Sequence, residues 1–527
     1  MSLFFNPGNE NFRMKRYDDY IDKTEMISIV NRTLCNRDKL SCVSRPRRFG
    51  KTYATAMLAA YYDKSCDSHE LFDDLAISKD PDYEKHLNKY NVMYLDMSFF
   101  IAEAEDKLQV VAYTRKRLIG ELMRMYPEYV HEHMTVSDAL EAIVDRDGSK
   151  YIAIIDEWDA PLRRAAATAE SKEEYLEFLL SLFKNTAVTE KVFAGAYMTG
   201  ILPIKKDGSQ SAVSEFREYS ILEPEQFAPY IGFTEDEVIA FCTKKSLDFN
   251  EMKRWYDGYT LPGAGEIYNS NSVMLAASYN SYKSYWQMSS AAGSLMEYLN
   301  MGFDGLGRDV DDLLKGNSIT VNTTTFRNDM YELNSRDEVI TLLIHFGYLA
   351  YDHEDGSCHI PNLEIELEFQ NSIRQVRHAE TMNRVKLSDT LFDAIEDLDE
   401  EETAKLIKQV HDEECSPRHY NKEDSLRQVI KLALFTYRDY YTGLEEVGGG
   451  NGYADMVFIP RRAARRSILI IELKKDDTPE NAIRQIKDRG YMTPYLSRKE
   501  DILLIGVTYD SNDPEKKHRC VIEEYER

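Results

Sequence analysis

The stretch Leu40-Ser-Cys-Val-Ser-Arg-Pro-Arg-Arg-Phe-Gly-Lys-Thr52 decides how the N-terminal part of this chain folds. Its first five residues are a short, mainly apolar run that predicts a buried strand, and the helical periodicity of residues 53–62 predicts a helix directly after the loop. A loop that joins a strand to a helix N-terminus can wrap its backbone N–H groups around a phosphate. This context favours a nucleotide phosphate site.

The end of the same loop carries the residue types that this chemistry needs. Gly50, Lys51 and Thr52 occupy the last three positions of a phosphate-binding loop, where the lysine reaches the β- and γ-phosphate oxygens and the hydroxyl holds Mg²⁺. Arg45 stands where such loops usually have their first glycine, so the general pattern is incomplete. An arginine-rich surface turn is the alternative interpretation.

A second acidic motif follows about 100 residues later. The apolar run 151–155 predicts a buried strand that ends in Asp156 and Glu157, at the sheet edge where ligands of α/β folds bind. We expect Asp156 to hold Mg²⁺ through water and Glu157 to polarise an attacking water. The run 192–199 predicts the next core strand, with Thr199 at its tip near the γ-phosphate.

The spacing of apolar runs indicates the fold class of the first 230 residues. Four strand-sized runs, at 40–44, 92–97, 151–155 and 192–198, are separated by helix-sized amphipathic segments. This alternation is typical of an α/β fold whose parallel sheet is covered on both faces. From about 270 to 415 the pattern is mainly helical, with strand alternation only at 342–351. Residues 393–414 predict a very acidic helix, either a solvated face or a domain boundary.

The last 110 residues predict a further α/β domain. A helix at 421–437 leads to a glycine run and to strands at 453–459 and 467–474, which the basic turn 461–466 joins as a hairpin. Asp455 and Glu472 can converge to hold Mg²⁺, and Lys474, on the same strand face as Glu472, can orient or help deprotonate a water. Glu423 is a candidate third acid, and an ordinary half-exposed charged hairpin is the alternative.

The charge balance limits which partners the protein can have. The chain has 91 acidic and 65 basic residues, a formal charge of −26, which argues against a protein that coats nucleic acid with its whole surface. Residues 461–490 are an exception, because nine basic and five acidic residues make this segment locally basic. The seven scattered cysteines and the lack of a signal-peptide pattern predict a cytoplasmic protein without a membrane span.

These motifs together resemble the AAA-type ATPase-like proteins of bacteria that often carry a C-terminal PD-(D/E)XK nuclease domain. The resemblance covers almost the whole chain, and Arg45 fits the loop that this family has. Two positions depart from the family pattern: Trp158 replaces a tyrosine, and Tyr453 stands where a basic residue usually precedes the aspartate. The motifs that carry the resemblance are Tyr20-Ile-Asp-Lys-Thr24, the loop 44–52, Ile154-Ile-Asp-Glu-Trp-Asp159, Trp255-Tyr-Asp-Gly-Tyr259, Tyr268-Asn-Ser-Asn-Ser272, Phe346-Gly-Tyr348 and Asp455…Glu472-Leu-Lys474…Gln485…Tyr491.

The resemblance implies a P-loop ATPase domain at 1–265, a mainly helical region at 266–415 and a restriction-endonuclease-like α/β domain at 416–527. It implies ATP and Mg²⁺ as cofactors, ATP hydrolysis, and a Mg²⁺-dependent nuclease that acts on DNA. The alternative is a nucleotide-dependent switch or scaffold whose nuclease-like domain binds a partner without cutting. A homo-oligomer is left open.

Overall fold

The computed structural model describes residues 2–526 except for short gaps, and it divides into two compact units. The N-terminal unit comprises Met1–Ser289 and Phe303–Glu366, and the C-terminal unit comprises Ser290–Gly302 and Leu367–Arg527. The three-part division by function at 265 and 415 stays a prediction. The gaps lie at 17–18, 165–166, 185, 205–214, 287–297, 299–300, 302, 304, 327–332, 376–378, 415–422, 435, 437–439, 450–451, 462–465 and 514–515.

The N-terminal unit is built on a five-stranded parallel sheet in the order β2-β3-β4-β1-β5. The four predicted apolar runs are four of its strands, and nearly all of their residues are buried because helices cover both faces. The expected α/β class is therefore confirmed. The strands are β1 (Leu40–Ser44), β2 (Asn91–Asp96), β3 (Tyr151–Asp156), β4 (Phe193–Gly200) and β5 (Arg217–Tyr219).

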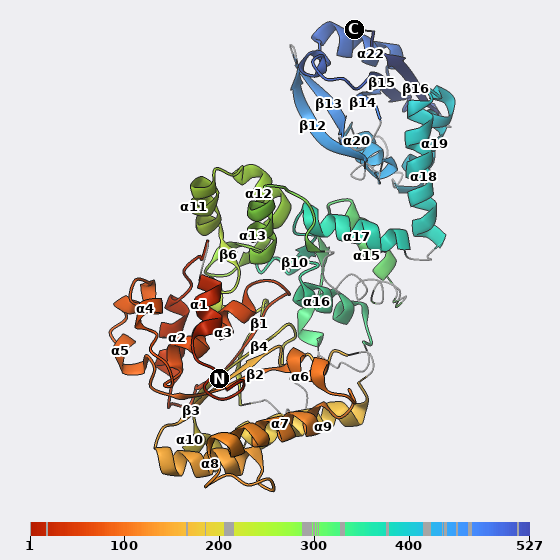
Figure 1. Cartoon of the computed structure of the whole chain (residues 1–527). Coiled ribbons are helices and arrows are strands. Elements are labelled where there is room, and N and C mark those ends of the chain that lie inside the picture. Colours follow the sequence, from red (N-terminus) through yellow and green to blue (C-terminus); the bar gives the residue numbers. More distant parts are fainter. Residues whose placement is uncertain are drawn as a thin grey trace. The chain divides into compact units, whose positions relative to one another are not determined.

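Helices of different chain segments cover the two faces of this sheet (Figure 1). Helix α3 (Lys51–Tyr62), which follows β1, packs against β2, β3 and β4 on one face. On the other face, apolar side chains of the sheet such as Met93, Ile155 and Met198 share one core with four later helices. These are α6 (Met97–Glu103), α7 (Val110–Met125), α8 (Val136–Asp147) and α9 (Ala169–Phe183), and α10 (Thr186–Val192) leads into β4.

A small helical module follows the parallel sheet within the same unit. Its three-stranded antiparallel sheet has the order β6-β8-β7, and the predicted capping box at the start of α11 is present, with Thr234 and Glu237 exchanging hydrogen bonds. The elements are β6 (Phe233–Thr234), α11 (Glu235–Lys245), α12 (Phe249–Tyr256), β7 (Tyr259–Leu261), β8 (Gly265–Tyr268) and α13 (Ser270–Tyr279).

The predicted strand at 342–351 is wrong over most of its length. Residues 342–346 belong to α16 (Arg336–Phe346), which Ser335 caps and Gly347 ends with φ 84°, and only β10 (Ala350–Tyr351) is extended. An apolar run of this length cannot distinguish a buried helix from a strand by periodicity alone. The neighbouring elements are α15 (Leu306–Leu314), β9 (Ile319–Thr320) and β11 (Ser357–His359), and the small sheet has the order β10-β11-β9.

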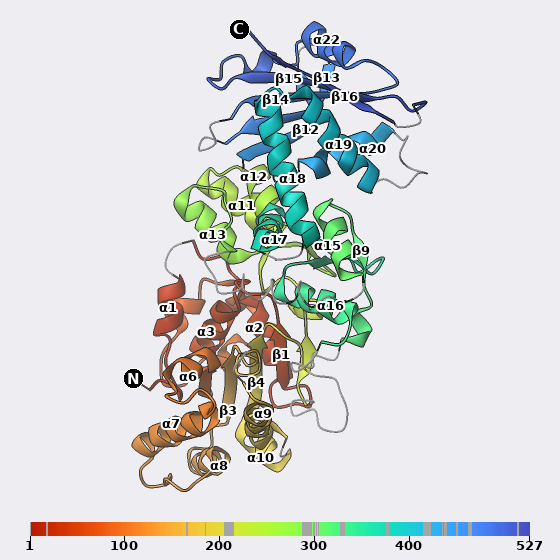
Figure 2. The same ribbon diagram turned by 90° about the vertical axis from the view of Figure 1, so that its right-hand side faces the viewer.

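The C-terminal unit contains a mixed five-stranded sheet in the order β12-β13-β14-β15-β16 (Figure 2). Only β14 and β15 pair in parallel, and the predicted hairpin is confirmed because β13 pairs antiparallel with β14. The strands are β12 (Tyr441–Gly449), β13 (Gly452–Pro460), β14 (Ile468–Lys475), β15 (Ile502–Tyr509) and β16 (His518–Glu524).

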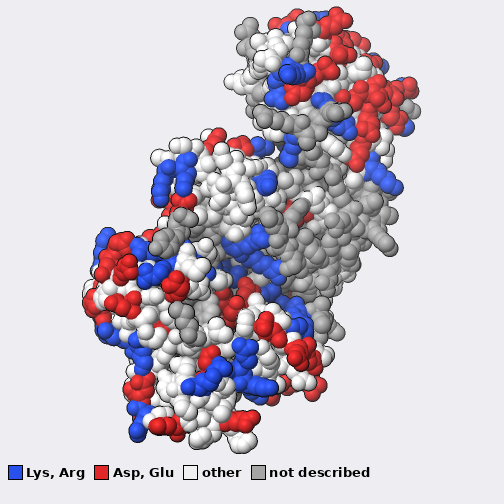
Figure 3. Space-filling view, in the orientation of Figure 1, with Lys and Arg blue, Asp and Glu red and all other residues white. Residues whose placement is uncertain are grey.

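Helices cover both faces of this second sheet as well. On one face, α18, α19 and α20 share a core with Met456, Phe458 and Ile471, and α22 packs on the other face with Val457 and Ile470. The acidic segment 393–414 belongs mostly to α19, and acidic side chains gather there on the face shown in Figure 3. The helices are α17 (Leu363–Gln375, which spans the unit boundary), α18 (Ala379–Glu396), α19 (Glu400–Glu414), α20 (Glu423–Ala433) and α22 (Pro479–Arg489).

Candidate functional site

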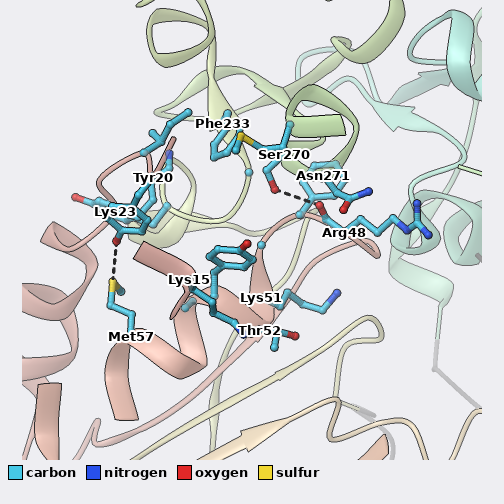
Figure 4. Close-up of a pocket in the computed structure, with 18 of the residues that line it drawn as sticks. Lys15, Tyr20, Lys23, Arg48, Lys51, Thr52, Met57, Phe233, Ser270 and Asn271 are labelled. Carbon is cyan, nitrogen blue, oxygen red and sulfur yellow. Dashed lines mark hydrogen bonds between the residues drawn. The ribbon is translucent and has the colours of Figure 1, made fainter. Parts of the chain in front are cut away.

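A pocket of about 470 Å³ opens at the loop between β1 and α3. Lys51 and Thr52 lie at one end, while Tyr20, Met57 and Phe233 lie at the other (Figure 4). Its size is within the range of small-molecule sites, roughly 300–1,000 Å³. The lining residues also include Lys15, Arg48, Gly50, Glu157, Tyr230, Gly232, Ser270 and Asn271.

The loop is held in a left-handed conformation at two positions. Arg48 has φ 67° and Gly50 has φ 94°, and Gly50 precedes the first residue of α3. The carbonyl of Arg48 accepts hydrogen bonds from Ser270 Oγ at 3.1 Å and from Asn271 N–H at 3.2 Å. The first turn of α13 is therefore attached to the loop between β1 and α3, a contact that the sequence analysis did not predict.

Lys51 is buried at the base of the loop. Its Nζ donates to the carbonyls of Arg45 at 3.1 Å and Pro46 at 2.8 Å, and it lies 3.9 Å from Glu157 Oε1. Burial lowers the pKa of the ammonium, while Glu157 and Asp156 act in the opposite direction. The lysine thus points into the loop, where it can meet an anion bound by the loop.

Asp156 ends β3, next in the chain to the pocket-lining Glu157, and is almost fully buried. Burial raises the pKa of this carboxyl to about 6, although a hydrogen bond with Thr52 opposes the shift. Thr55 Oγ1 lies 3.4 Å from Asp156 Oδ2. The predicted partners Thr52 and Asp156 are therefore brought together, and their hard oxygen atoms are of the kind that Mg²⁺ prefers.

Glu157 adopts a conformation that is rare for a residue with a side chain, with φ 52°. Its Oε2 accepts a 2.6 Å hydrogen bond from Arg163 Nη2, and its Oε1 faces Lys51. Strained backbone of this kind concentrates at functional sites. The structure thus orients the Glu157 carboxylate by two cations, of which the sequence analysis found only Lys51.

Two further acids were also missed. Asp159 is buried, accepts from Arg163 Nε at 2.8 Å and from the backbone N–H groups of Ile201 and Leu202, and so fixes the segment after β4. Asp96 lies beside Asp156 in the β2–β3 register and caps α6. Asp159 could have been predicted as a site residue, because it belongs to the acidic motif 154–159. Asp96 could not, because only the pairing of β2 with β3 places it beside Asp156.

Two residues that the sequence analysis named, Thr199 and Arg45, do not line the pocket. Thr199 is buried, and its hydroxyl donates to the carbonyl of Val43 at 2.9 Å, so it joins β4 to β1 and does not line the pocket. Arg45 is also fully buried and donates to the carbonyls of Ser44 and Tyr219. Burial lowers the pKa of its guanidinium to about 10. Arg45 therefore anchors the start of the loop to β5.

The motif at 20–24 shapes the apolar end of the pocket. Lys23 donates to the Pro229 carbonyl at 2.6 Å and to Glu237 Oε2 at 2.5 Å, and Tyr20 OH contacts Met57 Sδ at 3.6 Å. These contacts hold Tyr20 opposite the segment that carries Tyr230 and Phe233. A planar group could be enclosed between such surfaces.

A second group of polar residues gathers in the C-terminal unit. Asp455 Oδ2 accepts from the N–H of Leu473 at 2.9 Å, and Lys474 Nζ lies 3.1 Å from Glu472 Oε1. Gln485 on α22 donates to Glu472 Oε1 and lies 3.2 Å from the hydroxyl of Tyr491. The predicted set of Asp455, Glu472, Lys474, Gln485 and Tyr491 is thus brought together at the β13–β14 hairpin.

Glu472 carries the strongest sign of a ligand in this group. It is 3% exposed, and its Oε2 has no hydrogen-bond partner among the described residues. Burial and the neighbouring Asp455 raise the pKa of its carboxyl, while Lys474 lowers it. A divalent cation would satisfy this oxygen. Within the described part of the chain, no cluster of three acid, histidine or cysteine side chains is arranged to hold a metal.

Several predicted residues cannot be placed at this second site. Glu423 begins α20, but its side chain lies outside the described residues, as do Arg462 and Arg465 of the basic turn. Tyr453 is 70% exposed on β13, and Arg427 on α20 donates to Asp455 Oδ1 at 2.9 Å. Arg427 is the residue at this site that the sequence analysis missed.

Comparison with known proteins matches two parts of the chain to family models. Residues 8–209 match the family model described as "Predicted AAA-ATPase", and residues 421–519 match the PD-(D/E)XK nuclease superfamily. The chain therefore combines an AAA-ATPase-like domain with a PD-(D/E)XK nuclease-like domain. A relative along nearly the whole length is the "Uncharacterized protein in vnfD 5′region" of Azotobacter chroococcum mcd 1, which is 21% identical over 94% of each chain.

Two solved structures show a weak similarity to this chain. The Aeropyrum pernix ORC2 protein, in ADPNP and ADP complexes, is 14% identical, with 71% of this chain and 99% of that chain covered and a TM-score of 0.29. Cdc6p from Pyrobaculum aerophilum is 10% identical, with 70% and 98% covered and a TM-score of 0.28. At such TM-scores the similarity supports no conclusion about this chain. In the described residues, no helix is both long and apolar enough to cross a membrane.

Proposed function

We propose that the N-terminal pocket binds ATP with Mg²⁺ and hydrolyses it. The observation that carries this proposal is one pocket with Gly50, Lys51 and Thr52 at one end and an apolar surface at the other. A nucleotide needs both, because its phosphates require donors and its base requires flat apolar walls. The match to the AAA-ATPase family model supports the same conclusion.

Four residues at or beside the loop have a role in this proposal. Lys51 would exchange the neutral carbonyls of Arg45 and Pro46 for phosphate oxygens, which are stronger acceptors. Thr52 and Asp156 would hold Mg²⁺, which supplies charge neutralisation at the phosphates. Glu157, oriented by Arg163, would accept the proton of the attacking water.

Titration with a fluorescent ATP analogue in Mg²⁺ tests the binding half. Lys51→Ala is expected to weaken binding about 10- to 100-fold, because a charge-assisted contact contributes about 1.5–3 kcal/mol. Lys89→Ala, at an exposed position outside the pocket, is the matched control and should bind like wild type. Equal binding by wild type and Lys51→Ala would refute an ATP site at this loop.

We propose further that the C-terminal domain is a Mg²⁺-dependent nuclease that acts on DNA. Asp455 and Glu472 would hold the cation, and Lys474 would orient or help deprotonate the attacking water. The supporting observation is the Oε2 atom of Glu472, which has no hydrogen-bond partner among the described residues. The cation supplies charge stabilisation at the scissile phosphate. The basic residues of the segment 461–490 would hold the backbone, so binding should be weak, independent of sequence and steeply reduced by salt.

Incubation of labelled single- and double-stranded DNA with Mg²⁺ or Mn²⁺ tests this second half. Wild type should cut at least one of these substrates, and Asp455→Ala and Lys474→Ala should not. The exposed Arg519→Gln is a control on the same sheet and should cut like wild type. Equal cleavage by all variants would identify a contaminating nuclease. No cleavage by wild type with any metal, with or without ATP, would favour the switch or scaffold.

A further inference from the structure

Arg427 ties the α20 helix to the acid pair of the C-terminal unit. Its Nη2 lies 2.9 Å from Asp455 Oδ1, while the other oxygen, Oδ2, is held by the backbone N–H of Leu473 at 2.9 Å. Both carboxylate oxygens of Asp455 therefore have a donor. The Arg427 and Asp455 side chains are 28% and 21% exposed, so solvent and solutes reach the pair.

The pair has a direct consequence for cation binding. A cation that binds Asp455 through Oδ1 must compete with the guanidinium of Arg427, because both bind the lone pairs of this oxygen. Glu472 differs, because its Oε2 has no partner among the described residues, and its Oε1 is engaged by Lys474 and Gln485. A cation could therefore bind Glu472 Oε2 directly, whereas at Asp455 it would first have to displace the guanidinium of Arg427.

The chemistry of the guanidinium indicates what it would contact once released. Arginine presents a planar fork of donors that matches phosphate oxygens, and it stays charged at any pH that the protein experiences. The position two residues before Asp455 is Tyr453, an exposed aromatic residue, so β13 offers no basic side chain there. Arg427 brings a positive charge to the acid pair from the neighbouring helix instead.

We propose that Arg427 is a positioning residue that holds Asp455 in the cation-free protein and turns to a nucleic-acid phosphate when a divalent cation takes Asp455. This inference rests on the proposed nuclease function. It makes cation binding and nucleic-acid binding mutually dependent through one side chain. The cation and the Arg427 guanidinium compete for the same oxygen of Asp455. Asp455 and the phosphate in turn compete for the Arg427 guanidinium.

The test uses the full-length protein and two binding measurements that do not depend on cleavage. Titration calorimetry measures Mn²⁺ affinity, and fluorescence anisotropy measures the affinity for a labelled phosphorothioate DNA that resists cleavage, in EDTA and in Mn²⁺. For Arg427→Gln we expect Mn²⁺ to bind about 3- to 10-fold more tightly than to wild type, because the competing cation is gone. DNA affinity should be unchanged in EDTA and about 10-fold weaker in Mn²⁺.

Two further variants keep the test decisive. Arg427→Lys retains the charge and should keep Mn²⁺ affinity close to wild type, and the exposed Arg519→Gln should match wild type in every measurement. Unchanged Mn²⁺ affinity in Arg427→Gln, or an equal loss of DNA affinity in EDTA and in Mn²⁺, would overturn the inference alone. A wild-type protein that binds no Mn²⁺ would overturn the proposed nuclease function as well.

Discussion

The Nζ atom of Lys51 lies 3.9 Å from Oε1 of Glu157, so the lysine that begins α3 and the acid that follows β3 form an ion pair. Arg163 holds the second oxygen of the same carboxylate at 2.6 Å. Two cations thus hold the Glu157 carboxylate. An anion bound by the loop would draw Lys51 away from Glu157 and leave Arg163 as the cation that orients the carboxylate.

Replacement of Glu157 by glutamine should separate ATP binding from turnover. The amide keeps the size and hydrogen-bonding capacity of the side chain but cannot accept a proton, so phosphate release should fall about 100-fold or more. Affinity for ATP·Mg²⁺ should stay within a few-fold of wild type. Phosphate release and analogue binding are measured on the same preparations, with the exposed Glu170→Gln as control. Undiminished turnover would exclude Glu157 as the base.

Asp156→Asn should stabilise the N-terminal unit at neutral pH. Because the pKa of Asp156 is raised to about 6, the folded protein retains a proton that the unfolded chain has already lost, so this group reduces stability as pH rises from about 4 to 6. Above pH 6 the cost stays constant, at about 1–3 kcal/mol. Denaturant unfolding should show the variant more stable at pH 7 and equal to wild type near pH 4. A stability difference between Asp156→Asn and wild type that did not change with pH would show that the raised pKa of Asp156 is not its cause.

Gly258→Ala should be severely destabilising. Gly258 has φ 104°, and a Cβ there would lie 2.0 Å from the carbonyl oxygen of Pro361, so backbone must move. The expected loss is about 3 kcal/mol or more. Gly263→Ala is the matched control, since it has φ 80° with nothing within 4 Å, and should cost only about 1 kcal/mol. Thermal unfolding of both variants measures the loss of stability. Equal losses in the two variants would exclude the contact with Pro361 as the cause.

The cation affinity of the C-terminal domain should depend on pH through Glu472. Its raised pKa means that a proton competes with the cation at higher pH than for an ordinary glutamate. Mn²⁺ affinity should therefore rise with pH until the carboxylate is fully ionised. Glu472→Gln should bind Mn²⁺ about 10-fold more weakly or worse and lose this pH dependence. Calorimetry from pH 5 to 8 measures the Mn²⁺ affinity of both proteins. If Glu472→Gln kept the wild-type pH profile, a group other than Glu472 would cause the pH dependence.

Much of the fold was predictable from local patterns. Apolar runs of five to seven residues separated by amphipathic segments predicted the four strands β1–β4, since strands of a covered parallel sheet are apolar on both faces. The hairpin of β13 and β14 followed from two such runs joined by a short turn. The C-terminal part of α16 was mistaken for a strand because a helix buried on most sides loses its amphipathic period.

The sequence by itself determined which residue types stand at the strand ends: Gly50, Lys51 and Thr52 after β1, Asp156 and Glu157 after β3, and Asp455 and Glu472 in the hairpin. Only the tertiary structure decided which side chains hold them. Four hydrogen bonds could not be predicted from a local sequence pattern. They join Arg163 to Glu157, Ser270 to the loop carbonyl of Arg48, Arg427 to Asp455, and Thr199 to Val43. Spacing along a chain specifies the face of an element, whereas a hydrogen bond depends on how two elements pack, and packing is a property of the whole fold.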